Sequence, residues 1–386
     1  MVLQAIFFGV KCVFLLKKFI KMKIDNKQNL IVFSLLVLLF CMSSCGNKNV
    51  VNSGSDLYKK QPALHDTMGL QSYLDSIGDL DPSQWIKKDR KMVDSVFYSQ
   101  TKTCIKLSDN DYAILKNGCL KKALPIEFVK RIFTGISIDP VYFREDLKKK
   151  EIPIEFYSFS GKNPDFRYYA IVPAYDHGFT WECKVYFFHE QNLIGIHNVK
   201  HRYGLELDYF TDTDGLPTVF YKQNFESGTG IWWYNYYFYR FSGTEMIPAL
   251  NILENANLQY NWSFRSYWFE SKIVKTNPLT FNVSYYFEFP DTISNSPVRI
   301  FDDSTEIVYK WDSSERRYSA AFDDSKMDED KMVSFFINAD EYLFIHSFHN
   351  ILKRILSAGD NQKKQTVYDY LRTVKNSDWI KQRVGQ

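Results

Sequence analysis

Residues 231 to 241 read Ile-Trp-Trp-Tyr-Asn-Tyr-Tyr-Phe-Tyr-Arg-Phe, and this aromatic run constrains the fold more than any other part of the chain. Side chains alternate between the faces of a strand, so Trp232 and Tyr236 share one face while Trp233 and Tyr237 share the other. A strand that is apolar on both faces is usually buried between two layers. The alternative is an exposed platform on which Trp232 and Trp233 stack against sugar rings or peptide groups.

Similar segments make up an antiparallel β region over residues 161–322. They are dense in Tyr, Phe, Trp, Val and Ile, and short turns separate them. Because no helical segment comes between them, the sheets should be antiparallel. The candidate strands are 167–174, 181–188, 193–199, 203–210, 217–221, 231–241, 262–274, 279–289, 305–311 and 316–322.

Two segments of this region share one pattern. Tyr239 to Glu245 and Tyr309 to Glu315 both read Tyr, a basic residue, an aromatic residue, three turn residues and Glu. Each predicts a hairpin made of an aromatic strand, a tight turn and a returning strand. The two copies suggest repeated meander units, as in a propeller or in stacked sheets, although two hairpins can also agree by chance.

The region before the strands, residues 63–160, is predicted to mix helices and strands. Helical periodicity occurs at 70–77 and 84–96, and Pro125 is placed for the first turn of another helix.

The last region, residues 323–386, is predicted to be helical. Residues 340–356 carry an apolar stripe that ends at Gly359, and a second helix follows at 362–374. The acidic run at 323–330 reads as a solvated loop before these helices, where negative charge is favourable. The predicted fold is therefore mainly β, of the α+β class: an antiparallel, aromatic-rich meander, propeller-like or in stacked sheets, with a mixed N-terminal part and a C-terminal helical pair.

The net charge of +3 depends on the N-terminus, since the first 44 residues contain six Lys and one acid, Asp25. The remainder has 42 basic and 44 acidic residues. A chain without a basic surplus lacks the electrostatic basis for nucleic-acid binding, so we exclude that class of function.

Residues 30 to 40 form an apolar stretch, Leu-Ile-Val-Phe-Ser-Leu-Leu-Val-Leu-Leu-Phe, preceded by Lys23 and Lys27. As a helix it would extend roughly 16 Å, about half of the hydrocarbon thickness of a bilayer. This layout is typical of a signal peptide over residues 22–44. Residues 1–21 then lie upstream of the true start at Met22, or form a separate N-terminal membrane anchor.

The stretch ends in Ser43 and Ser44 directly before Cys45, and this resembles the lipobox of bacterial lipoproteins. The resemblance covers residues 23–45 and implies that the signal is cleaved before Cys45, whose sulfur and new amine are acylated. The alternative is an ordinary secretory signal cleaved near Ser44. Several acyl chains, at about 0.8 kcal/mol per buried CH₂, would hold the protein firmly on a membrane.

Residues 45–62 are polar and read as a lipidated tether. No Asp follows Cys45, so the resemblance implies an outer-membrane lipoprotein of the cell envelope, with the membrane face left open.

Three cysteines, Cys104, Cys119 and Cys183, remain in the mature chain. Turn residues at 108–111 separate two apolar segments, so a hairpin could bring Cys104 and Cys119 together as a disulfide. Buried free thiols are the alternative.

The segment Asp212-Thr213-Asp214-Gly215 resembles the calcium loops of FG-GAP-type β repeats. Phe210 and Tyr221 stand near where further oxygen ligands would be needed, so an Asp-Gly hairpin turn is the preferred interpretation. Two histidine pairs also fail to predict a metal site: His197 and His201 fall on a strand, where four residues separate them by roughly 13 Å. His346 and His349 fall on a helix without a nearby carboxylate. We predict no metal and no cofactor.

No local nucleophile or nucleotide-binding motif is present in the sequence. The expected function is a non-catalytic binding or assembly module that contacts another envelope protein or a glycan. The alternative is a hydrolase of envelope or other polysaccharide, with catalytic carboxylates that the sequence leaves unassigned.

Overall fold

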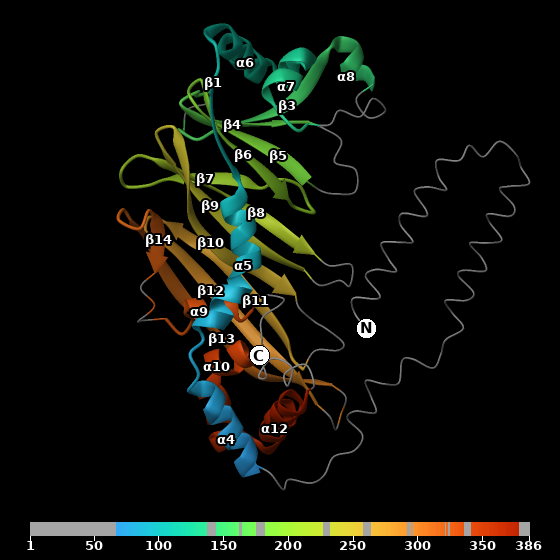
Figure 1. Cartoon of the computed structure of the whole chain (residues 1–386), viewed down its shortest axis with the longest axis vertical. Helices are drawn as coiled ribbons and strands as arrows, with labels where there is room; N and C mark the ends of the chain where they lie inside the picture. The colour runs from blue at the N-terminus through green and yellow to red at the C-terminus, as the bar shows by residue number, and fades with distance from the viewer. Residues whose placement is uncertain are drawn as a thin grey trace, which may run out of the picture. The chain divides into compact units, whose positions relative to one another are not determined.

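A computed structural model describes residues 67–136, 144–161, 164–174, 182–226, 232–257, 264–291, 294, 296–320, 322, 325–335 and 341–377. The chain divides into two compact units, Met1–Ala63 and Leu64–Gln386, and every described residue lies in the second. Figure 1 shows the fold of this second unit.

Two antiparallel sheets form most of the unit, so the predicted mainly β, aromatic-rich class is confirmed. The first sheet has the order β1-β6-β5-β4-β3-β2. Its strands are β1 (Thr101–Lys106), β2 (Ala123–Pro125), β3 (Glu151–Ser158), β4 (Tyr168–Pro173), β5 (Glu182–His189) and β6 (Asn192–Lys200).

The second sheet is one continuous meander, because its eight strands are ordered as they follow one another in the chain. It is a single curled sheet and is not divided into separate blades. Its strands are β7 (Leu207–Thr211), β8 (Pro217–Glu226), β9 (Trp232–Ser242), β10 (Glu245–Asn257), β11 (Ser266–Thr276), β12 (Leu279–Pro290), β13 (Pro297–Asp312) and β14 (Arg317–Ala320).

Both hairpins predicted from the shared pattern are present. The β9–β10 turn joins Ser242 to Glu245 through Gly243, whose φ of 57° suits a residue without a Cβ. The β13–β14 hairpin pairs Asp312 with Arg317. Strand β7 is shorter than predicted, since the chain turns at Tyr203 and pairs only from Leu207 onward.

The second sheet splays between β10 and β11. Strand β10 pairs with β9 along its whole length, but in the described part of the chain it pairs with β11 only at Asn255, Ala256 and Asn257. The curl of the sheet brings β14 into contact with β10 without a ladder between them. The edge of β10 from Pro248 to Leu253 therefore has no strand partner among the described residues.

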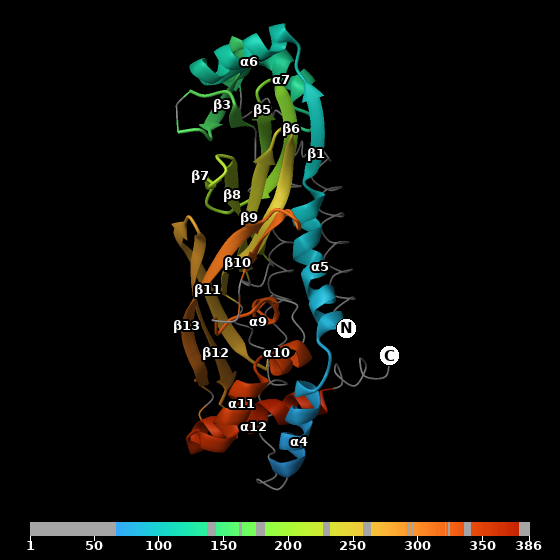
Figure 2. The same ribbon diagram turned by 90° about the vertical axis from the view of Figure 1, so that its left-hand side faces the viewer.

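Helices cover the ends and one face of the sheets (Figure 2). Helices α6 and α7 lie at one end of the unit, and α4, α11 and α12 pack together at the other. The described helices are α4 (Thr67–Gly78), α5 (Ser83–Ser99), α6 (Asp109–Lys121), α7 (Ile126–Ile132), α8 (Arg144–Lys149), α9 (Glu329–Val333), α10 (Glu341–Ser347), α11 (His349–Ala358) and α12 (Asn361–Asn376).

The predicted C-terminal helical pair is confirmed with one difference. The segment expected as a single helix over 340–356 is broken at Phe348 into α10 and α11, and Gly359 ends α11 as expected. Asp360 begins α12 by accepting a hydrogen bond from the N–H of Lys363. Among the described helices, none is both long and apolar enough to span a bilayer.

Candidate functional site

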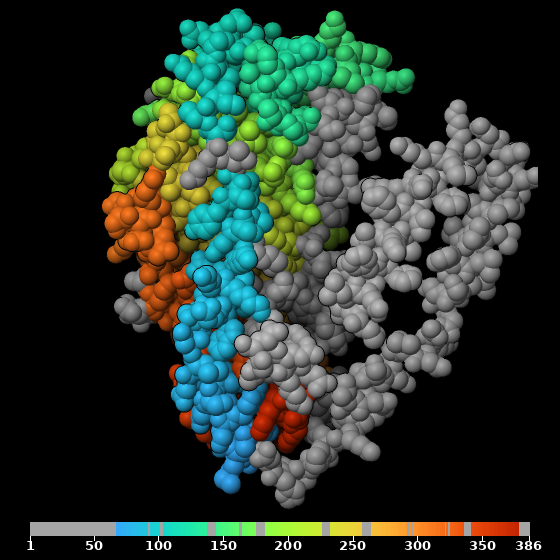
Figure 3. All heavy atoms as spheres, in the orientation of Figure 1, coloured from blue at the N-terminus to red at the C-terminus, as the bar shows by residue number. Residues whose placement is uncertain are grey.

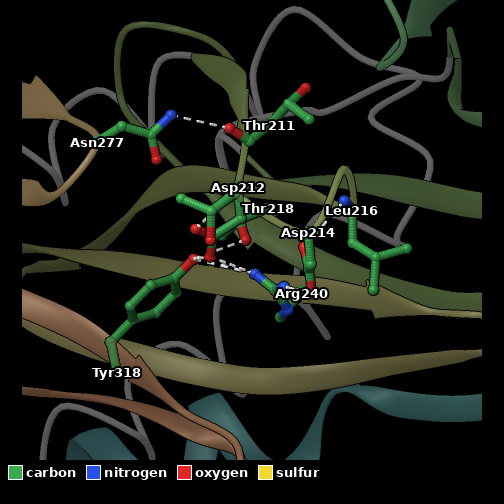
Figure 4. Close-up of polar contacts among 9 residues, drawn as sticks. Thr211, Asp212, Asp214, Leu216, Thr218, Arg240, Asn277 and Tyr318 are labelled. Atoms are coloured by element: carbon green, nitrogen blue, oxygen red, sulfur yellow. Dashed lines mark hydrogen bonds and ion pairs between the residues drawn. The ribbon is translucent and has the colours of Figure 1, made fainter.

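A buried arginine joins the first and last strands of the curled sheet (Figure 4). Arg240 on β9 is only 2% exposed, and its guanidinium forms ion pairs with Asp212 and Asp214 of the β7–β8 turn. Its Cζ atom lies 4.4 Å from the centre of the Trp311 ring on β13. A buried guanidinium requires such charged partners. This cluster therefore fixes how the two ends of the curled sheet lie against each other.

The same cluster positions Tyr318 of β14. The Tyr318 hydroxyl donates to Asp212 Oδ2 at 2.6 Å, so Thr218, 3.0 Å away, donates to the Tyr318 oxygen. Burial, with the Asp212 hydrogen bond, raises the pKa of Tyr318. The Asp-Thr-Asp-Gly segment is thus the predicted hairpin turn, with Gly215 at φ +79°, and its carboxylates serve Arg240 and Tyr318.

Two cavities meet beside this closure. The first, of about 250 Å³, lies between α5, the unpaired edge of β10, β14 and α9. The second, of about 410 Å³, lies between β1, the β9–β10 turn and the β13–β14 turn. Both are lined by Tyr98, Pro248 and Arg317, so they adjoin at these residues, and together they are here called the α5 groove.

Two hydrogen bonds join α5, which forms one wall of the α5 groove, to strand β9. Tyr237 and Tyr239 on β9 donate hydrogen bonds to the carbonyl oxygens of Val93 and Phe97 on α5, each at 2.9 Å. Figure 3 shows α5 crossing this face of the molecule next to the orange β13–β14 hairpin. Tyr98, at the junction of the two cavities, is 60% exposed although its ring is apolar.

A third cavity, of about 410 Å³, lies where the two sheets meet, and we call it the Lys222 cavity. The Lys222 ammonium lies 3.0 Å from Glu206 and 3.3 Å from Glu254. Burial raises the pKa of Glu254. For Lys222, burial opposes the charged form, but Glu206 and Glu254 outweigh it and raise the pKa. Aromatic side chains of Tyr157, Phe220 and Tyr236 complete the lining.

The aromatic run occupies the buried position that its pattern favoured. Trp233 is 4% exposed and stacks on Phe225, with ring centroids 5.0 Å apart. Trp232 is half-buried against Tyr234. Trp233 therefore offers no ring face to a ligand, and the expectation of an exposed Trp232–Trp233 platform is wrong for Trp233.

The predicted hairpin between Cys104 and Cys119 is wrong. Ser108 accepts a hydrogen bond from the N–H of Asp111 and begins α6, so Cys104 lies on β1 and Cys119 on a helix. Cys104, Cys119 and Cys183 are all free thiols. Cys104 is exposed and lines the α5 groove, whereas burial raises the pKa of Cys119 and of Cys183 to about 12.

The histidines that the structure describes are not among the residues that line these three cavities. His197 is buried on β6 with its Nδ1 3.2 Å from the Tyr221 hydroxyl, and His201 follows that strand. His349 Nε2 lies 3.1 Å from Asp75 on α4, a carboxylate that the sequence pattern did not reveal. In the part of the chain that the structure describes, no three His, Cys, Asp or Glu side chains gather as metal ligands would.

Cys45, the signal segment and the tether lie outside the described residues. The groove and the Lys222 cavity were both missed from the sequence, because their walls come from segments far apart in the chain. Arg90 and Val333 both line the groove, and Tyr157 and Tyr236 both line the cavity. Comparisons with protein-family models, curated proteins and solved structures find no match to this chain.

Proposed function

We propose that this chain is a lipid-anchored protein of the cell envelope, held in the outer membrane by acyl groups on Cys45, that binds an extended segment of a partner protein. The observation that carries the binding role is the α5 groove, in which two cavities join at Tyr98, Pro248 and Arg317. An elongated groove suits an elongated ligand. A non-catalytic binding or assembly role follows.

The composition of the groove supports a protein ligand. Its lining combines buried or half-buried apolar side chains such as Phe97, Leu250 and Met332 with exposed charged groups such as Arg317 and Glu315. An apolar centre with a polar rim is the usual arrangement of a protein interface. The exposed Tyr98 ring adds an aromatic anchor of the kind that dominates binding energy.

The anchor is tested by metabolic labelling with palmitate, followed by fractionation of the membranes. We expect the wild-type chain to carry label and to sediment with outer membranes, and Cys45→Ala to lose both properties. Cys183→Ala is the matched control, because that thiol is buried. Unchanged label and sedimentation in Cys45→Ala would contradict the lipid anchor.

The groove is tested by crosslinking from Cys104, which is exposed within it. A thiol-specific photocrosslinker on Cys104 in intact cells should join the chain to one defined partner. The control moves the thiol to Tyr203, which is 78% exposed and away from the groove, in a Cys104→Ser background. Replacing Tyr98 with Ala should abolish the crosslink, and equal yields from both thiol positions would contradict a groove-bound partner.

One observation favours the alternative, a polysaccharide hydrolase. Glu206 and Glu254 both contact the Lys222 ammonium, but the Glu206 side chain is 55% exposed and that of Glu254 only 13%, and burial raises the pKa of Glu254. Two neighbouring carboxyl groups in unlike environments are the usual equipment of glycoside hydrolysis. Release of reducing ends from an envelope polysaccharide, lost in Glu254→Gln, would establish this alternative.

A further inference from the structure

We propose that the Lys222 cavity binds a neutral, hydroxyl-rich sugar ring of a glycan. This site is separate from the α5 groove, and the inference does not depend on a protein partner or on hydrolysis. The cavity volume of about 410 Å³ falls within the range of small-ligand sites.

The ammonium of Lys222 is the central hydrogen-bond donor. It is three-pronged, and Glu206 at 3.0 Å and Glu254 at 3.3 Å take two of its N–H groups. The two carboxylates hold the nitrogen in place, and the Lys222 side chain is still 25% exposed. Two carboxylates thus leave the third N–H of the ammonium for a ligand oxygen.

The charges around Lys222 select a neutral ligand. Glu206, Asp208 and Glu254 outnumber the single lysine, so an anion would be repelled. A cation would compete with Lys222 for carboxylates that already hold an ammonium. A hydroxyl group can accept from Lys222 and donate to Glu206 or Asp208 at the same time, which neither ion can do.

The aromatic walls supply the apolar part of the recognition. Tyr157 on β3 and Phe220 on β8 are half-buried in the lining, and Tyr236 lies beneath Lys222, with its ring centre 5.9 Å from the ammonium nitrogen. Sugar rings carry C–H groups on their flat faces and hydroxyls at their edges. A cavity with aromatic faces and a polar edge matches both.

A buried amide on the same face of β8 as Lys222 also lacks hydrogen-bond partners, although it does not itself line the cavity. Asn224 is 1% exposed, and neither its Nδ2 nor its Oδ1 atom has a hydrogen-bond partner. It lies two residues beyond Lys222 on β8, on the same face, beside Tyr234 in the register with β9. Buried amides are almost always satisfied, so an ordered water or a polar ligand group beside Lys222 is expected to complete its hydrogen bonds.

The test uses the full chain purified in detergent and isothermal titration with maltotetraose, cellotetraose and tetra-N-acetylchitotetraose. We expect at least one of these neutral oligosaccharides to bind. Glu206→Gln and Asp208→Asn, which change exposed side chains, should each weaken its binding about tenfold by removing a charge-assisted hydrogen bond. Glu245→Gln, also exposed but in the α5 groove, is the matched control and should bind as wild type does.

Failure of all three sugars to bind would overturn the proposal, as would equal affinities in wild type, Glu206→Gln and Asp208→Asn. Binding of spermine in place of the sugars would also overturn it, because a cation would then be the preferred ligand. The Cys104 crosslink should be unaffected by Glu206→Gln, so loss of the sugar site and loss of the partner groove can be distinguished.

Discussion

The hydroxyl group of Tyr239 donates a hydrogen bond to the backbone carbonyl oxygen of Phe97 at 2.9 Å. Phe97 belongs to the last turn of α5, where carbonyl groups have no partner within the helix. Tyr237 makes the same bond to Val93, one turn earlier. Strand β9 therefore binds α5 through its tyrosine hydroxyl groups as well as through the packing of its aromatic rings.

Removing the hydroxyl group should lower the free energy of unfolding more at Tyr239 than at Tyr237. Tyr239→Phe leaves the Phe97 carbonyl buried and unpaired, so we expect it to lower the free energy of unfolding by about 1–3 kcal/mol. Tyr237→Phe should cost about 1 kcal/mol or less, since the Val93 carbonyl retains its helical partner. Urea denaturation of both variants checks the order, and equal losses would contradict it.

The Arg240 cluster predicts unequal effects for its two aspartates. Asp212 is nearly buried and serves both Arg240 and Tyr318, whereas the Asp214 side chain is 49% exposed. We expect Asp212→Ala to lower the free energy of unfolding by about 3–5 kcal/mol, because it leaves a buried guanidinium with a single, exposed partner. Asp214→Ala should cost about 1 kcal/mol. Denaturant midpoints with unchanged slopes provide the measurement, and the reverse order would refute the assignment.

The buried His197 predicts a loss of stability in mild acid. Burial lowers its pKa to about 3, against about 6.5 in an unfolded chain. As the pH falls below about 6.5 the unfolded state binds a proton that the folded state excludes, so the free energy of unfolding decreases by up to about 1.4 kcal/mol per pH unit.

Ordinary carboxyl pKa values lie near 4, below this interval, so the fall in stability from about pH 6.5 to 5 comes from the histidines. Glu254, whose pKa burial raises, acts in the opposite direction. His197→Gln should flatten the fall in stability over this interval. His201→Gln measures the contribution of the neighbouring histidine, whose pKa burial also lowers. If the free energy of unfolding still falls as steeply with pH in the double variant, groups other than His197 and His201 cause the acid sensitivity.

The two tryptophans of β9 should contribute unequally to stability, because one is buried and the other is half-buried. Trp233→Ala removes a buried ring and should cost about 3–5 kcal/mol of unfolding free energy. The half-buried Trp232 should cost less, about 1–2 kcal/mol by the area rule. Thermal unfolding checks both, and a larger loss for Trp232 would show that the burial of the two faces is reversed.

The aromatic alternation of residues 231–241 was enough to predict a buried central strand, because burial on both faces follows from the side-chain pattern alone. The turn residues at 243 and 313 likewise predicted two hairpins. Local patterns sufficed where the structure depends on neighbours in the chain.

Local patterns failed where the same residues can form either a turn or the start of a helix. Ser108 and Asp111 predicted a turn, yet a serine followed three residues later by an acid also begins a helix, and α6 is the result. The Arg240 cluster depends on how the sheet curls, and the Lys222 cavity depends on which strands lie side by side and on their register. That geometry brings Asp212 to Tyr318 and Lys222 to Glu254, and no spacing in the sequence records it.

The meander order of the second sheet determines which contacts can form early in folding. Each strand from β7 to β14 pairs with its neighbour in the chain, so every ladder closes a short loop at a small entropic cost. Strand β1 is different, because Thr101 pairs with Ile196 across almost a hundred residues. We therefore expect the curled sheet to assemble hairpin by hairpin, and β1 and α5 to join it last. The α5 groove would then form only after the curled sheet has folded.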